Sequence, residues 1–151
     1  MKKNIDIRPI LPIETHVVRH PVLRNGRPKS DCVFDDDEKE SSLHFGAFRG
    51  GELIGVSSAY LRPHDFLSGK NSFQIRGVAI LPMAQGQGIG RALMKTTEGK
   101  LIDKGCDLIW LNAREKAVPF YQRLNYLPFG EPFPIEKIGI HCCLYKTFDH
   151  A

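Results

Sequence analysis

Residues 85 to 91 read Gln85-Gly86-Gln87-Gly88-Ile89-Gly90-Arg91 and separate the apolar run Val78–Leu81 from a helical pattern that begins at Ile89. Glycines at alternate positions remove the Cβ atoms that would keep a ligand away from the backbone. The start of the following helix leaves several N–H groups without intrahelical acceptors, and the helix dipole is positive at this end. The stretch therefore predicts a cradle for a phosphate or pyrophosphate.

Two common phosphate-binding motifs do not fit this stretch. A Walker loop needs Gly-Lys followed by Ser or Thr, whereas Gly90 is followed by Arg91 and Ala92. A Rossmann fingerprint needs a third glycine at its sixth position, which is Arg91 when counted from Gly86. The pattern that fits is Gln-x-x-Gly-x-Gly. A glycine-rich turn without a ligand is the alternative that the loop alone leaves open.

The Gln-x-x-Gly-x-Gly pattern resembles the acetyl-coenzyme A loop of the GCN5-related N-acetyltransferases (GNAT). Further stretches are similar to a bacterial group within this superfamily: Arg76-Gly77-Val78-Ala79-Ile80, Asn112-Ala113-Arg114, Phe120-Tyr121, Gly130-Glu131-Pro132-Phe133 and Ile138-Gly139-Ile140-His141. The proline that precedes the histidine in that group is missing here. The similarity is strong from about Phe73 to Phe148 and thin before it.

The composition indicates one globular domain over residues 1–151. The chain is 42% hydrophobic and 25% charged, as ordinary soluble proteins are, and no apolar stretch approaches the length of a membrane span. The net charge of +4 is spread among acidic residues, so nucleic acid is not predicted as a partner. A mild positive field instead suits the arrival of a polyanionic cofactor.

The N-terminus and the cysteines indicate a cytoplasmic protein. The segment Met1–Asp6 has a basic start but lacks the apolar core of a secretory signal. The cysteines form no Cys-x-x-Cys pair, so neither a zinc site nor a disulfide framework is predicted. Adjacent Cys142 and Cys143 on a strand would point to opposite faces.

Hydrophobic periodicity and turn signals predict alternating strands and helices. The expected strands are Ile5–Ile7, Leu43–Phe48, Leu53–Leu61, Phe73–Leu81, Asp107–Asn112, Tyr126–Phe129 and His141–Phe148, with a bend at Pro128–Pro134 inside the last pair. The expected helices are Ile13–Leu23, Gly88–Lys104 and Lys116–Leu124, the last closed by a left-handed Asn125. The fold class is thus α/β, and the resemblance implies a central twisted mixed sheet of six to seven strands flanked by helices.

The segment from Arg24 to Ser42 is polar and contains the acidic run Asp35-Asp36-Asp37-Glu38. Such runs usually form solvated loops, and this is the reading that we favour. A mobile segment that borders the acceptor site is the alternative.

The resemblance implies how acetyl-coenzyme A is bound. The loop would hold the pyrophosphate, and backbone groups of the strand before it would bond the pantetheine arm. The expected cofactor-binding residues are Val78, Ala79, Ile80, Gln85, Gly86, Gln87, Gly88, Ile89, Gly90, Arg91 and Asn112. For Asn112, a cap on the next helix is an equal alternative. No metal is implied.

The resemblance also places the catalytic residues. Tyr121 would be the general acid that protonates the departing thiolate, and its alternative is a packed core aromatic. His141 is the best candidate for the base by residue type, with Glu131, Glu115 or a water chain as alternatives. Arg76 cannot act as a base and is expected, with His141, on the acceptor side.

The sequence therefore predicts an N-acetyltransferase that moves an acetyl group from acetyl-coenzyme A to a primary amine. Competing interpretations are transfer of a longer acyl group and a coenzyme A-binding sensor without turnover. A small-molecule amine is favoured over a protein lysine, and a homodimer is left open.

Overall fold

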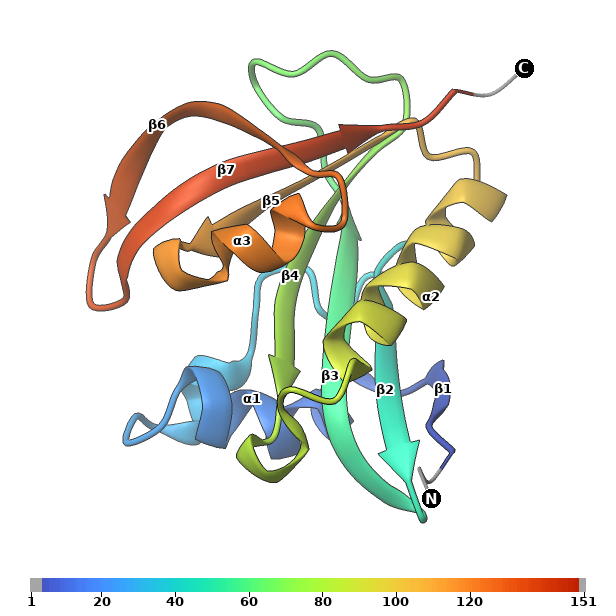
Figure 1. Cartoon of the computed structure of the whole chain (residues 1–151), viewed down its shortest axis with the longest axis vertical. Coiled ribbons are helices and arrows are strands. Elements are labelled where there is room, and N and C mark those ends of the chain that lie inside the picture. The colour runs from blue at the N-terminus through green and yellow to red at the C-terminus, as the bar shows by residue number, and fades with distance from the viewer. Residues whose placement is uncertain (1–3, 150–151) are drawn as a thin grey trace. The chain divides into compact units, whose positions relative to one another are not determined.

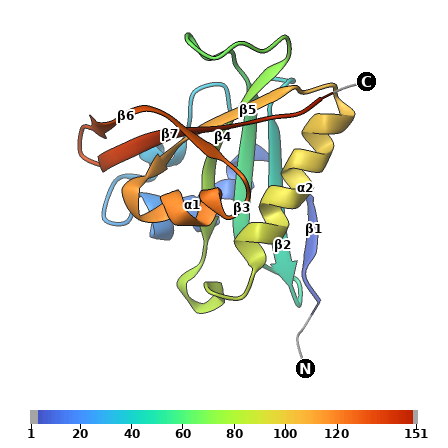
Figure 2. The same cartoon turned by 45° about the horizontal axis from the view of Figure 1, so that its top comes forward.

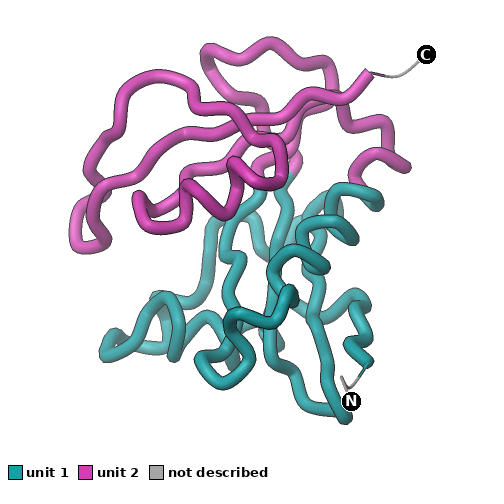
Figure 3. The backbone as a smooth tube through the Cα atoms, viewed as in Figure 1, with its two compact units in different colours: residues 1–60, 75–100 teal, residues 61–74, 101–151 magenta. Residues whose placement is uncertain are grey.

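The computed structural model describes residues 4–149 and divides the chain into two compact units (Figure 3). Unit 1 comprises Met1–Tyr60 and Ile75–Lys100, and unit 2 comprises Leu61–Gln74 and Leu101–Ala151. The single domain that we expect over residues 1–151 stays a prediction. The basic start Met1–Lys3 lies outside the described residues.

Seven strands within the described residues form a sheet in the order β1-β2-β3-β4-β5-β7-β6. They are β1 (Asp6–Pro9), β2 (Leu43–Arg49), β3 (Glu52–Leu61), β4 (Ser72–Ile80), β5 (Leu108–Arg114), β6 (Leu127–Ile135) and β7 (Gly139–Thr147). The helices are α1 (His16–Leu23), α2 (Ile89–Asp103) and α3 (Val118–Gln122), with 3₁₀ helices at Pro12–Thr15, Lys29–Cys32, Pro82–Ala84 and Glu115–Ala117. The mixed α/β class with six to seven strands is confirmed.

Helices cover both faces of the strands in unit 1 (Figures 1 and 2). A buried cluster joins α2 to β2 and β3, and its members are Phe45, Ala47, Ile54, Ala84, Ile89 and Leu93. On the other face Val18 of α1 packs against Val56 and Ala79. Each fully buried aliphatic side chain of this kind stabilises the fold by about 1.5–3 kcal/mol. Both ends of the predicted loop are therefore anchored in one core.

Strands β2 and β3 form a hairpin that turns at Arg49-Gly50-Gly51-Glu52. Gly50 and Gly51 have φ values of 59° and 80°, and two left-handed residues in succession are what a tight hairpin turn needs. The register then shifts, because Ala47 faces Gly55 while Phe48 faces Leu53. Ile54 is the extra residue of this bulge.

Strand β4 passes from unit 2 into unit 1. Its first three residues pair in parallel with β5, from Ser72 opposite Leu108 to Gln74 opposite Trp110. The crossover through α2 explains this direction, since parallel neighbours need a long connection. Because the pairs β1–β2, β2–β3, β5–β7 and β6–β7 are antiparallel, the sheet is mixed, as expected.

In unit 2 the short helix α3 covers one face of the strands (Figure 1). Residue-by-residue pairing of β5 with β7 puts Ile109 and Lys146 on the same face. Lys146 Nζ donates to the Leu124 carbonyl at 3.0 Å and lies 5.6 Å from the Tyr126 ring centroid. Leu124 and Tyr126 directly follow α3, so this face is the one that α3 covers.

The proline-rich segment is a strand and not the bend that we expect. β6 runs through Pro128, Pro132 and Pro134, and the chain reverses only at residues 136–138, where Lys137 has a φ of 69°. A proline lacks the N–H that a central strand must donate, but β6 lies at the edge of the sheet. Its register with β7 also shifts between Phe129 and Phe133.

Several boundaries differ by a few residues. β1 includes Pro9, which is tolerated because β1 is the other edge strand. The first helix begins with a 3₁₀ turn, so α1 starts at His16. α3 ends at Gln122, and Asn125 adopts the expected left-handed conformation with a φ of 73°.

None of the helices in residues 4–149 is both long and apolar enough to cross a membrane. The four cysteines, all within the described residues, form no disulfide bond.

Candidate active site

The glycine-rich loop of unit 1 has an accessible backbone. Gly86 and Gly88 have φ values of 75° and 82°, which residues with a side chain rarely adopt. A Cβ atom built on either glycine meets no protein atom within 4 Å. The space in front of both residues is open, as an anion cradle requires.

The start of α2 supplies the donors for this cradle. The first helical hydrogen bond of α2, or the first bond of its ladder, runs from the Ala92 N–H to the Gly88 carbonyl at 3.1 Å. The N–H groups of Ile89, Gly90 and Arg91 precede this ladder at the positive end of a 15-residue helix. This arrangement suits a pyrophosphate.

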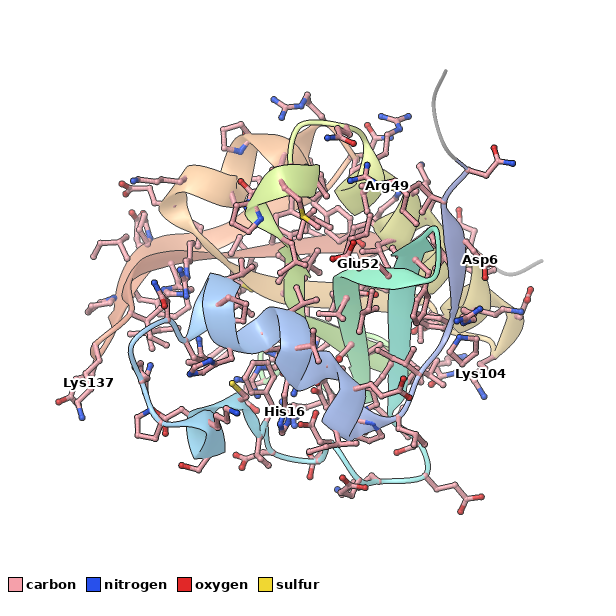
Figure 4. The ribbon with its side chains drawn as sticks, turned by 90° about the horizontal axis from the view of Figure 1, so that it is seen from below. Asp6, His16, Arg49, Glu52, Lys104 and Lys137 are labelled. Carbon is pink, nitrogen blue, oxygen red and sulfur yellow. The ribbon has the colours of Figure 1, made fainter. Side chains whose placement is uncertain are left out.

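The two glutamines brace the loop with their side chains. Gln85 Nε2 donates to the Ile80 carbonyl at 2.9 Å, and Gln87 Nε2 donates to the Met83 carbonyl at 3.2 Å. Arg49, labelled at the β2–β3 turn in Figure 4, donates to Gln87 Oε1. Arg49 thus adds a positive charge beside the loop. Sequence analysis missed this residue because it lies 38 positions earlier in the chain.

The strand segment before the loop is fixed by packing on both faces. Ala79 is buried with Val18 of α1, whereas Val78 and Ile80 are half-buried. A Cβ atom on Gly55 would lie 2.7 Å from Ile80 Cδ1, so the glycine leaves room for Ile80. The side chains of Ala79 and Ile80 thus pack in the core.

Arg76 lies against Phe34, a residue of the polar segment. Its guanidinium carbon is 4.5 Å from the centre of the Phe34 ring. The neighbouring Gly77 has a φ of 67°, and a Cβ atom there would lie 2.9 Å from Phe34 Cε2. The left-handed glycine breaks the alternation of the strand, so positions 76 and 77 both face Phe34.

The acidic run is not a solvated loop throughout, which corrects our prediction. Asp37 is only 4% exposed and forms a two-point ion pair with the fully buried Arg19, at 2.7 Å and 3.2 Å. Burial alone would raise the pKa of Asp37, but hydrogen bonds from Arg19, Tyr60 and the Phe34 N–H lower it below its usual value. The pair ties α1 to the segment that follows it.

His44 and Ser58 extend this buried network. His44 Nε2 lies 2.9 Å from the Asp37 carbonyl, which can only accept, so Nε2 carries the proton. His44 Nδ1 then accepts from the Ser58 hydroxyl at 2.7 Å, and Ser58 Oγ accepts from Arg19 at 2.9 Å. Burial lowers the pKa of His44 and keeps it neutral. These contacts describe a structural network.

Tyr121 lies in α3 of unit 2 and is 8% exposed. Its ring meets the rings of Phe120 and Tyr126 edge-on, with centroids 4.9 Å and 5.9 Å away. Burial raises the pKa of Tyr121 well above its usual value of about 10. The phenol is therefore protonated throughout the working pH range, as a general acid must be.

Asn112 is exposed in the middle of β5. It pairs with Cys143, so it lies on the face opposite to the one that α3 covers. The capping alternative is wrong, because Arg114 and Ala117 occupy the two N-cap positions that follow.

His141 is 5% exposed and shares the face of Asn112. Its Nδ1 lies 2.9 Å from the Gly139 carbonyl and therefore carries the proton in the neutral ring. The lone pair of Nε2 is then the one that could accept a proton. The ring tilts against Phe133, with centroids 6.3 Å apart.

The expected residues are divided between the two units, and within unit 2 Asn112 and His141 share one face of the strands whereas Tyr121 belongs to α3 on the other. Unit 1 holds Arg76, the Val78–Ile80 segment and the loop, and unit 2 holds Tyr121, Asn112 and His141. Among residues 4–149, no three His, Cys, Asp or Glu side chains gather as a metal site needs.

Comparison with known proteins decides the family. The model of the acetyltransferase (GNAT) family matches residues 13–126. The uncharacterized N-acetyltransferase YitI of Bacillus subtilis is 33% identical over 143 residues, which cover 95% of this chain and 96% of YitI. The chain belongs to the GNAT family. The resemblance seen in the sequence and the acyltransferase class of enzyme are confirmed.

Other proteins are similar over part of the chain or in fold alone. Glucosamine 6-phosphate N-acetyltransferase of Trypanosoma brucei brucei is 30% identical over 76 residues, about half of each protein. Escherichia coli ElaA superposes with a TM-score of 0.76 at 18% identity, over 95% of this chain and 99% of ElaA. An aminoglycoside 6'-N-acetyltransferase complexed with coenzyme A superposes with a TM-score of 0.75 at 14% identity, over 94% of this chain and 96% of that protein.

Proposed function

We propose that this GNAT protein moves an acetyl group from acetyl-coenzyme A to the primary amine of a small molecule. The loop at the start of α2 carries the proposal, because open glycines at positive φ and N–H groups ahead of the ladder suit a pyrophosphate. The relative from Trypanosoma brucei brucei is named for glucosamine 6-phosphate, a small-molecule amine. The cytoplasmic location, the lack of nucleic-acid or membrane partners and the homodimer stay predictions.

Each residue has a proposed task in acyl transfer. Main-chain groups at Gly86–Arg91 bind the pyrophosphate, and those of Val78 and Ile80 hold the pantetheine arm, with Asn112 as a further contact. The amine attacks the thioester carbonyl, a C–N bond forms and the C–S bond breaks. Tyr121 donates its phenolic proton to the leaving sulfur, and His141 Nε2 accepts the proton that the amine loses.

An acceptor screen that measures free thiol tests the activity. Turnover with at least one amine, dependent on acetyl-coenzyme A, is the expected result. Thiol release with longer acyl donors at equal efficiency would contradict acetyl transfer. Tight cofactor binding with no release for any amine would indicate a sensor.

Gly88→Val should weaken acetyl-coenzyme A binding by about 10- to 100-fold. The side chain would enter the open space in front of the loop and oppose the left-handed backbone at this residue. Calorimetry on the folded proteins measures the effect. Gly26→Val is the matched control, since Gly26 has a φ of 77° and equally open surroundings away from the loop. Equal affinity in both variants would remove the loop from the binding site.

His141→Gln should lower kcat by about 10²-fold or more and remove the acidic limb of its pH profile. The limb arises because Nε2 must be unprotonated to accept a proton. Pre-steady-state thiol release, measured at a series of pH values from about 5 to about 9, gives the profile. His16→Gln on α1 is the control (Figure 4). An acidic limb that survives in His141→Gln would assign the base to another group.

A further inference from the structure

Arg49 of unit 1 contacts the glycine-rich loop. It is the last residue of β2, and its Nη1 donates to Gln87 Oε1 at 2.5 Å, beside the two glycines that Gln87 separates. The β2–β3 turn and the loop lie at the same end of unit 1 (Figures 1 and 2). A cation therefore lies next to the main chain to which we assign the pyrophosphate.

The core keeps the turn and the loop in place. One buried cluster contains Ala47 and Ile54, which flank the turn. The same cluster contains Ala84 and Ile89, which flank the loop. The Leu81 N–H also donates to the Ile54 carbonyl at 2.8 Å. Close packing thus sets the distance between the turn and the loop before any ligand arrives.

Gln87 orients the guanidinium. Its Nε2 donates to the Met83 carbonyl at 3.2 Å, and a carbonyl can only accept, so Oε1 is the atom that faces Arg49. The amide is neutral, so it leaves the positive charge of Arg49 uncompensated. Among residues 4–149 the Arg49 side chain makes no other hydrogen bond, and its contact with Gln87 is exposed. The other N–H groups of the guanidinium are therefore accessible to a ligand.

The charge around Arg49 favours an anion. Glu52 pairs with Arg49 across the turn, where Figure 4 labels both, but in the described part of the chain their side chains form no ion pair. The first turn of α2 contains no acidic residue and includes the exposed Arg91. From Phe66 to Thr97 the sequence has no Asp or Glu. A phosphate at the loop would thus meet the positive end of α2 and nearby cations, and no carboxylate of the loop itself.

We propose that Arg49 binds a phosphate group of coenzyme A, which makes the β2–β3 turn part of the cofactor site. Coenzyme A carries two such groups, the pyrophosphate and the 3'-phosphate of its ribose, and a guanidinium can bind the oxygens of either at two points. Gln87 is the positioning residue, because it holds the guanidinium beside the loop. The inference rests on the proposed function, which assigns the pyrophosphate to this loop.

Calorimetry with two acetyl donors tests the inference. Arg49→Ala should raise the Kd for acetyl-coenzyme A by about 10- to 100-fold, as loss of a charge-assisted contact does. Acetyl-dephospho-coenzyme A keeps the pyrophosphate and lacks the 3'-phosphate. A contact with the pyrophosphate raises the Kd for both donors by the same factor, whereas a contact with the 3'-phosphate leaves the Kd for the dephospho donor unchanged. If wild type and Arg49→Ala bind both donors equally well, the inference is overturned.

Arg8→Ala is the matched control. Arg8 is exposed on the neighbouring strand β1, and it contacts Asp6 at 3.1 Å and the centre of the Phe48 ring at 3.9 Å. The Kd of this variant for acetyl-coenzyme A should equal that of wild type. A loss as large as that of Arg49→Ala would be an effect of general charge and would contradict a bound phosphate. Arg49→Lys keeps the charge but loses the fork, so it should recover only part of the affinity.

A double-variant cycle tests the positioning role of Gln87. Gln87→Leu should raise the Kd for acetyl-coenzyme A by a smaller factor than Arg49→Ala, and it should add little in the Arg49→Ala background, because it acts through the guanidinium. Factors that multiply would refute this role. S-acetylpantetheine has neither phosphate, and NMR titration should give it the same affinity for wild type and variants. A loss of that affinity would show a disturbed loop and not a lost phosphate contact.

Binding and turnover separate this inference from the proposed function. A wild-type protein that binds acetyl-coenzyme A but releases no thiol with any amine would contradict acetyl transfer, and the comparison of Kd values would still decide the role of Arg49. A wild-type protein that binds neither phosphorylated donor would overturn both.

Discussion

Tyr121→Phe should lower kcat by about 10²- to 10⁴-fold while the Kd for acetyl-coenzyme A stays unchanged. The substitution keeps the buried ring and its edge-on contacts with Phe120 and Tyr126, and it removes only the proton. Burial holds the pKa of the phenol high, which at first sight opposes donation to a thiolate. The same apolar surroundings also raise the pKa of a thiolate formed there, so transfer between the two is not made harder.

Tyr126→Phe is the control for this prediction. Tyr126 is 1% exposed and its ring contacts that of Tyr121, so the substitution removes a hydroxyl group from the same region of the core. Single-turnover rates with saturating acetyl-coenzyme A give the chemical step directly. A rate constant for Tyr121→Phe that equals that of wild type at every pH would make Tyr121 a packing residue.

The sequence was informative where local chemistry determines structure. The Gly50-Gly51 turn, the strand–loop–helix around Gly88 and the left-handed Asn125 depend on residues next to one another. Each needs a backbone conformation that few residue types adopt, so the residue types at these positions predict the conformation. The boundaries of β3, β4 and α2 were accordingly predicted within one or two residues.

The features that sequence analysis missed depend on distant partners. The acidic run contains four similar residues, and only the tertiary position of Arg19 makes Asp37 a buried one. The prolines of β6 led us to predict a bend. A strand tolerates prolines at the edge of a sheet, and the edge position of β6 follows from the strand order of the whole sheet.

In the candidate site, too, the features set by adjacent residues could be predicted and those set by distant residues could not. The anion cradle could be predicted because its glycines and the helix start are contiguous. Arg76 was expected on the acceptor side from the resemblance alone. Its contact with Phe34 and the proximity of Arg24 to the same ring arise from a loop that folds back over β4, which no local pattern encodes.

Asp37→Asn should destabilise the protein by about 3–5 kcal/mol, as removal of one partner from a buried ion pair does. Arg19 would keep its charge with 0% exposure, and the amide would present N–H groups where a carboxylate now accepts from Arg19 and Tyr60. Urea unfolding at pH 7 measures the loss. Asp31→Asn is the control, because its pair with Arg27 is partly exposed and such pairs contribute at most about 1 kcal/mol.

The pH dependence and a double variant identify the ion pair as the cause. The pKa of Asp37 is lowered on folding, so its contribution is complete above the unfolded pKa of about 3.9 and is lost as pH falls through the folded value. The stability difference between wild type and Asp37→Asn should therefore stay constant above about pH 5 and shrink below pH 4. Arg19→Met with Asp37→Leu should be more stable than Asp37→Asn, since no charge stays buried alone. A double variant that is less stable than the single one would show that the network matters through its other hydrogen bonds, to Ser58 and the Cys32 carbonyl, more than through the charge pair.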